Sequence, residues 1–277
     1  MSKSSPDKFG WFPYNGSKRW MLTHLEPLFQ AWSGKGRFID PFCGGGAPSW
    51  LARKTHPDVN QILSDVDPWL LACYRVQTDG LRPTVPTDFT NLKDWYLLGD
   101  EDLPRLSHDE RALRFLITNL TAWGHRLVPQ PKGTLRFTAD PAWTTAEYLV
   151  PRLVGLLDTR WLHSRDVVAQ RDWKETVAGA REGDLVFLDP PYTETLGYTS
   201  KWTLSDQIDV WEMSEILVKR GCSVVLTNHG EMERLYARLS LSTRVINRPG
   251  TGKTGKPRQE LLVWSPDLNP AKSIFES

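Results

Sequence analysis

The sequence predicts an α/β fold with a doubly wound, mostly parallel sheet, and three observations support this prediction. Short apolar runs typical of buried strands alternate with helical segments in the N-terminal third and again after about residue 180. A glycine-rich loop follows the first run, where open α/β sheets bind ligands. A Gly/Lys-rich connection joins the last two strand candidates, which predicts a C-terminal antiparallel hairpin.

The N-terminal elements follow from apolar spacing. Apolar residues at helical spacing around Trp20 and Leu25 predict a helix over residues 18–31, which Gly34 and Gly36 end. After it we predict a strand at 37–40, a helix at 49–54, a strand at 61–65 and a helix at 68–76.

The alternation stops between residues 81 and 163, where Pro-rich turns, a helical stretch at 111–122 and a polar segment at 123–138 occur. We expect this part to be a small, mostly helical insert for target recognition, within a catalytic domain formed by residues 1–80 and 164–277. Alternation resumes with a strand at 184–189, a helix at 206–219 and strands at 223–227, 242–247 and 260–264.

Composition excludes several classes of protein. The three cysteines form no CxxC pair, and the six histidines show no metal-ligand spacing, so we expect neither a disulfide scaffold nor a metal site. No stretch approaches about 18 apolar residues, so we expect a soluble, cytoplasmic protein without a membrane span. The net charge of +1 neither favours nor excludes nucleic acid, because binding needs only one basic face.

The glycine-rich loop runs from Asp40 to Ala47. Gly44 and Gly46 form a GxG pair, but Ser49 leaves the dinucleotide fingerprint incomplete. Asp65 lies 21 residues after Gly44, at the end of the second predicted strand, where a carboxylate can accept hydrogen bonds from ribose hydroxyls. A tight turn with a helix-capping Asp is the alternative. Together the features indicate a nucleoside cofactor.

A second loop, Asp189-Pro190-Pro191-Tyr192, ends a buried strand. The Asp189 carboxylate and the Pro190 carbonyl can accept the two hydrogens of an aromatic amine, which draws its nitrogen toward tetrahedral geometry. Prolines fix φ and stiffen the loop, and Tyr192 offers a face for stacking by an extruded base. The alternative is a strand end capped by two prolines.

In this order the segments resemble the DNA adenine methyltransferase (Dam-like) family in its alpha arrangement, over about residues 11–265. The resemblance implies transfer of a methyl group from S-adenosylmethionine to the N6 amine of a flipped adenine in double-stranded DNA. Tyr14 and Lys18 match the N-terminal motif, which contacts the methionine part of the cofactor. Asp172 matches the acidic-aromatic motif near the cofactor adenine, and Thr227-Asn-His resembles the Ser-Asn-His segment after the catalytic loop.

The resemblance assigns the site residues. The expected catalytic residues are Asp189, Pro190, Pro191 and Tyr192. The expected cofactor-binding residues are Tyr14, Lys18, Asp40, Phe42, Gly44, Gly46, Asp65, Asp172 and Asp189. Gly230 departs from the family, because many relatives carry Asp at that position, and the insert matches faintly, through Asn119…Gly124 and Lys132-Gly133.

Basic and polar residues of the insert and of the C-terminal connection are candidates for contact with DNA. They are Asn119, Arg126, Lys132, Arg136, Arg248, Lys256 and Arg258. Packing of the insert and a solvated turn are the alternatives. The segment Gly250–Thr254 is not a P-loop, because Asn247 stands where the first glycine is required and a strand, not a helix, follows.

Two other functions stay open at this stage. An N4-cytosine methyltransferase would use the same machinery, and nucleoside analysis of the product separates the two amines. A catalytically silent DNA-binding regulator would keep the fold but not need Asp189. The expected partner is double-stranded DNA, with the protein a monomer or a weak dimer.

Overall fold

The fold is given by a computed structural model that describes residues 12–14, 16–122, 130–135, 139, 141–192, 202–236, 240–248 and 258–269. Seven strands form one sheet in the order β3-β2-β1-β4-β5-β7-β6. The strands are β1 (Phe38–Asp40), β2 (Gln61–Asp65), β3 (Val167–Gln170), β4 (Leu185–Leu188), β5 (Ser223–His229), β6 (Ser242–Arg248) and β7 (Arg258–Trp264).

Six of the seven strands run in the same direction, and β7 runs opposite to them. β1 pairs in parallel with β2 and β4, and the parallel part continues to β3 on one side and β5 on the other. β7 runs antiparallel between β5 and β6. The predicted fold class, with its closing antiparallel hairpin, is therefore confirmed. β3 was not predicted from the sequence; it is an edge strand whose residues are only half-buried or exposed.

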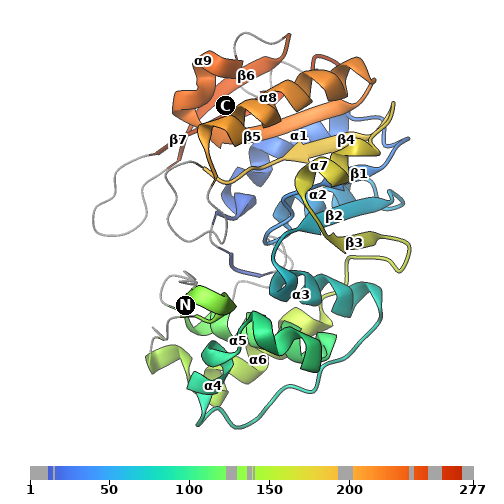
Figure 1. The fold of residues 1–277 in the computed structure, drawn as a ribbon. Coiled ribbons are helices and arrows are strands. Elements are labelled where there is room, and N and C mark those ends of the chain that lie inside the picture. Colours follow the sequence, from blue (N-terminus) through green and yellow to red (C-terminus); the bar gives the residue numbers. More distant parts are fainter. Residues whose placement is uncertain are drawn as a thin grey trace.

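Helices cover both faces of the sheet (Figure 1). On one face Phe38 and Phe187 share a core with α1 and α2, and on the other Ile39 and Val186 pack with α7 and α8. These helices are α1 (Leu22–Ala31), α2 (Ala47–Thr55), α7 (Trp173–Ala178) and α8 (Leu204–Lys219), with the short α9 (Glu233–Tyr236) after β5. The alternation of faces explains why the central strands are continuous apolar runs.

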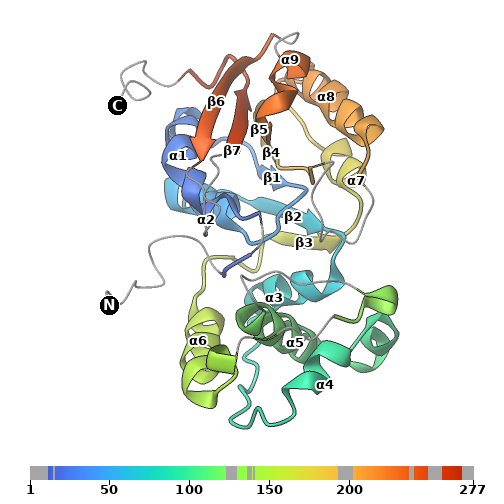
Figure 2. The same cartoon turned by 90° about the vertical axis from the view of Figure 1, so that its left-hand side faces the viewer.

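Four further helices in the described part of the chain form a group beyond the β3 edge of the sheet (Figures 1 and 2). They are α3 (Pro68–Thr78), α4 (Leu92–Leu97), α5 (His108–Thr121) and α6 (Ala146–Asp158). Ser107 and Glu110 form a capping box at the start of α5. Phe115 of α5 lies edge-on to Phe12, 5.5 Å between ring centroids. The helical part thus shares one core with the sheet, and its role as a target-recognition insert stays a prediction.

No helix among the described residues is long and apolar enough to cross a membrane.

Candidate active site

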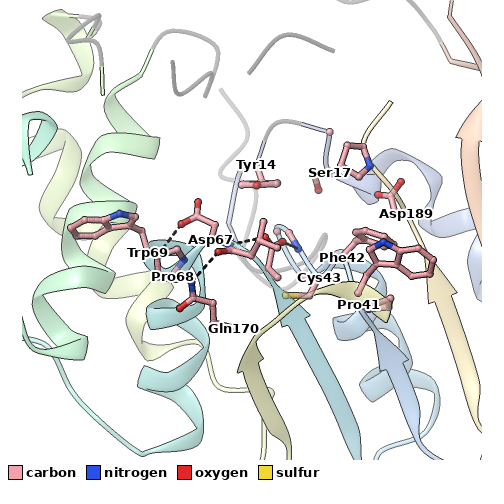
Figure 3. Close-up of a pocket in the computed structure, with 18 of the residues that line it drawn as sticks. Tyr14, Ser17, Pro41, Phe42, Cys43, Asp67, Pro68, Trp69, Gln170 and Asp189 are labelled. Atoms are coloured by element: carbon pink, nitrogen blue, oxygen red, sulfur yellow. Dashed lines mark hydrogen bonds between the residues drawn. The ribbon is translucent and has the colours of Figure 1, made fainter. Parts of the chain in front are cut away.

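A cavity of about 680 Å³ opens at the carboxyl ends of the central strands (Figure 3). In the figure Tyr14 lies between Asp67 on one side and Asp189 on the other. The predicted site residues on its wall are Tyr14, Lys18, Phe42, Gly44, Gly46, Asp65, Asn119, Asp172, Asp189 and Pro191. The structure therefore brings the glycine loop and the Asp-Pro-Pro loop together around one space, although 145 residues separate Gly44 from Asp189.

The glycine loop is shaped for close approach. Gly44 and Gly46 have φ of 42° and 73°, a region that favours glycine. A Cβ on Gly44 would lie 3.1 Å from the Tyr14 ring, and the Tyr74 hydroxyl donates to the Gly44 carbonyl at 2.7 Å. Tyr14 therefore packs directly on the loop, and a side chain at Gly44 would press on its ring.

Asp65 is tied to this loop. One carboxylate oxygen accepts from the Gly44 amide at 3.3 Å, and the other accepts from the Asp67 amide at 3.1 Å. Burial, with the nearby Asp67 carboxylate, raises the pKa of Asp65 to about 6. Because Asp65 also lines the cavity, its carboxylate can accept hydrogen bonds from hydroxyl groups of a ligand.

Asp40 lies behind the loop. It is 1% exposed and is absent from the cavity wall. Its carboxylate accepts from the Ser49 hydroxyl at 2.7 Å and from the Phe42 amide at 3.3 Å. The geometry thus gives Asp40 a supporting place under the loop, whereas the sequence analysis expected it at the cofactor.

Burial raises the pKa of Asp40 to about 7, and the Ser49 hydrogen bond only partly opposes this. A raised pKa means that the folded state binds a proton that the unfolded state releases, so stability falls as pH rises from about 4 to about 7. Asn does not ionise, so Asp40→Asn should not show this loss. We therefore expect the free energy of unfolding of the variant, relative to that of the wild type, to rise by on the order of 2 kcal/mol from pH 5 to pH 8. Urea unfolding at both pH values measures the difference, and an equal effect of the substitution at both would contradict it.

The Asp-Pro-Pro-Tyr loop starts at the end of β4, and its carboxylate is paired. Lys18 Nζ lies 2.6 Å from Asp189 Oδ1, and the Thr227 hydroxyl donates to the same oxygen at 2.7 Å. Lys18 is 5% exposed and Asp189 18%, so this is a largely desolvated ion pair. Burial raises the pKa of Asp189 above its ordinary value, while Lys18 and Thr227 lower it and Glu260 raises it. Sequence reasoning missed the Lys18 contact and the role of Thr227.

Polar side chains of α8 and β5 hold the loop in place. Gln207 Nε2 donates to the Pro191 carbonyl at 2.8 Å, and Asn228 Nδ2 donates to Gln207 Oε1 at 2.7 Å. Both side chains are 1% exposed. From the sequence, Asn228 was recognised only as part of the Thr-Asn-His segment, and Gln207 was not predicted.

Pro190 and Tyr192 are not among the residues of the cavity wall. The Tyr192 hydroxyl donates to Glu260, and its ring meets His229 edge-on at 6.3 Å. Lys18 Nζ lies 5.2 Å from the centre of the same ring. Tyr192 therefore borders the Asp189–Lys18 pair at the rim of the cavity.

An aromatic group lines the cavity near α7. The Phe42 ring lies 5.8 Å from Trp173, and 5.7 Å from Trp202 at an interplanar angle of 84°. Asp172 caps α7 through the Lys174 amide, at 2.8 Å. Sequence reasoning missed Trp202, because nothing in the local pattern separates it from the other tryptophans of the chain.

The predicted DNA-binding residues are spread out. Arg126, Arg136 and Lys256 lie outside the described residues. Lys132 is exposed and pairs with Glu101 at 3.5 Å, and Arg258 starts β7. Asn119, in contrast, is 1% exposed on α5 and faces the cavity. Arg248 lies 3.9 Å from Glu260. Among the described residues no group of three or more His, Cys, Asp or Glu side chains could hold a metal ion.

Known proteins resemble this chain in sequence. The family model of the D12 class N6 adenine-specific DNA methyltransferases matches residues 14–122. The Type II methyltransferase M1.LlaDCHI of Lactococcus lactis is 26% identical, over 80% of this chain and 82% of its own length. The Type II methyltransferase M.MjaIII of Methanocaldococcus jannaschii is 22% identical, over 90% of this chain and 96% of its own. The DNA adenine methylase of Escherichia coli is 31% identical over 36% of this chain and 41% of its own.

Among solved structures, a SAM-dependent methyltransferase from Agrobacterium tumefaciens aligns with 90% of this chain and 62% of its own. The identity is 10% and the TM-score 0.44.

Proposed function

We propose that the chain is a DNA adenine methyltransferase related to the D12 class, and that the cavity at the ends of the central strands is its active site. The cavity binds S-adenosylmethionine over the glycine loop. A target adenine, flipped out of double-stranded DNA, meets it at Asp189 and is methylated on N6.

The residues present fit this cofactor. Ser17 Oγ and Trp202 Nε1 both belong to cavity-lining residues and are buried without a partner among the described residues, so a ligand can satisfy them. Asp65 offers a carboxylate for ribose hydroxyls, and the Phe42–Trp173–Trp202 group offers apolar faces for a purine. When bound, the cofactor supplies a methyl group that its sulfonium activates for displacement.

Asp189 carries the proposed step. Two neighbours occupy its Oδ1, so Oδ2 can accept one N6 hydrogen. Pro190 is not itself on the cavity wall, but it lies between the wall residues Asp189 and Pro191, and we propose that its carbonyl accepts the other hydrogen once the base has entered. An amine held in this way would direct its N6 lone pair at the methyl group that the bound cofactor supplies, and Asp189 would accept the proton that the methylated amine releases. The hydrogen bond from Gln207 to the Pro191 carbonyl restrains the loop in the geometry that this attack needs.

The observation that supports this proposal most is the meeting of Asp189 and the glycine loop on one cavity wall. The test is expression in a methylation-free host, followed by nucleoside analysis and mapping of modified bases. We expect N6-methyladenine at one short sequence. N4-methylcytosine alone, or no modified base, would overturn the proposal.

The aromatic group allows a binding prediction. Trp202→Ala removes one aromatic face of the Phe42–Trp173–Trp202 group and the indole N–H donor of Trp202. The variant is expected to bind S-adenosylhomocysteine about tenfold more weakly. Trp202→Phe keeps the apolar face and is expected to lose less. Isothermal titration calorimetry measures both affinities. An unchanged affinity of the Ala variant would contradict the proposal that this aromatic group contacts the purine of the cofactor.

A further inference from the structure

We propose that Glu260 is a positioning residue that holds the ring of Tyr192 in the orientation needed to receive the flipped adenine. This inference rests on the proposed function and extends it, because Glu260 has so far no assigned role. It links the C-terminal hairpin to the catalytic loop through one hydrogen bond.

The contact itself joins distant parts of the chain. The Tyr192 hydroxyl donates to Glu260 Oε2 across a separation of 68 residues. Glu260 is 5% exposed on β7, which lies between β5 and the edge strand β6, and His229 and Ile246 are its register partners. A carboxylate at such a place is expensive unless its oxygens are satisfied, and here Tyr192 satisfies one of them.

The other oxygen faces a cation. Arg248 Nη1 lies 3.9 Å from Glu260 Oε1, and the Arg248 guanidinium lies 5.4 Å from the centre of the Trp20 ring. Arg248 is partly exposed, so it compensates the buried carboxylate while still reaching solvent. The arrangement keeps Glu260 an acceptor for the tyrosine hydroxyl.

Two further side chains surround the Tyr192 ring. The His229 ring touches it edge-on, and the Lys18 ammonium lies near its face. Tyr192 directly follows the two prolines of the catalytic loop. The hydrogen bond at the hydroxyl therefore fixes the direction in which the ring points from the loop, while His229 and Lys18 restrict the rotation of its plane.

Paired variants test the coupling. We expect Glu260→Ala and Tyr192→Phe each to lower kcat about tenfold, and the double variant to be no slower than either single one, because both remove the same hydrogen bond. Glu260→Gln keeps an oxygen that accepts the hydroxyl and is expected to retain at least about a third of the activity. Glu215→Ala, which removes a partly exposed carboxylate of α8 that pairs with Lys219 at 3.6 Å, is the control and should leave kcat within about twofold.

Fluorescence of 2-aminopurine, placed at the target adenine of the mapped site, reports the extruded base directly. We expect a lower signal with Glu260→Ala and with Tyr192→Phe, at unchanged affinity for S-adenosylhomocysteine. Additive losses in the double variant, or full fluorescence with Glu260→Ala, would overturn the positioning role. If no site could be mapped with the wild-type protein, the proposed function would fail instead, so the two failures are distinguishable.

Discussion

Replacing Asp189 by Asn is expected to lower kcat for methyl transfer roughly 10³-fold, with little change in cofactor affinity. The amide keeps the size of the side chain but removes the negative charge that accepts the N6 hydrogen. It also leaves the buried Lys18 ammonium without its counter-charge, so the folded state of the variant is to be checked by thermal unfolding. Incorporation of labelled methyl groups into DNA measures the rate.

A matched substitution separates this effect from a general loss of charge. Asp158 pairs with Arg82 at 3.2 Å on the surface, and both side chains are more than half exposed. Asp158→Asn is therefore expected to change the rate by less than about twofold. More than a tenth of the wild-type rate in Asp189→Asn would remove that carboxylate from the chemistry, and the view of a silent DNA-binding regulator would gain if the variant kept its effect in cells.

The fold was predictable wherever burial imposes a simple pattern. β4 is buried on both faces, and its run of apolar residues marks it clearly. β3 could not be predicted in this way, because its side chains are half-buried or exposed at the edge of the sheet, where no apolar run is required. The helix predicted at 18–31 begins with a turn of 3-10 helix at Lys18–Met21 before α1.

The site was predictable only in part. Strand ends of a parallel sheet meet at one edge, so residues such as Asp65 and Asp189 could be placed together from their positions alone. Contacts between side chains of different strands could not be predicted in this way. The hydrogen bond between Tyr192 and Glu260 depends on β7 lying between β5 and β6, and no local sequence pattern predicts that strand order.

Lys18 illustrates the same limit. By resemblance it was expected to contact the cofactor, and its 2.6 Å approach to Asp189 Oδ1 points to a second role. Both interpretations place it on the cavity wall. Only the distance to the carboxylate distinguishes them, and that distance comes from the three-dimensional packing of residues 171 positions apart.

Replacing Lys18 by Met is expected to lower kcat at pH 7 about 100-fold and to move the acid limb of the pH–rate profile to higher pH. Burial raises the pKa of Asp189, Lys18 opposes it and Glu260 adds to it, so without the ammonium the pKa rises further. Because the ionised carboxylate is the active form, activity is lost as pH falls through that pKa, and the variant loses it at a higher pH than the wild type. Activity measured from pH 5 to pH 10 should show partial recovery of the variant at the alkaline end.

Lys18→Arg retains the positive charge and is expected to keep the acid limb near that of the wild type. If Lys18→Met instead left the pH profile in place and weakened only the affinity for S-adenosylhomocysteine, Lys18 would serve the cofactor alone. The two interpretations thus predict different measurements on one variant. A shift of the acid limb follows from the charge beside Asp189, because a group that merely held the methionine part of the cofactor would change its affinity and not the ionisation of the carboxylate.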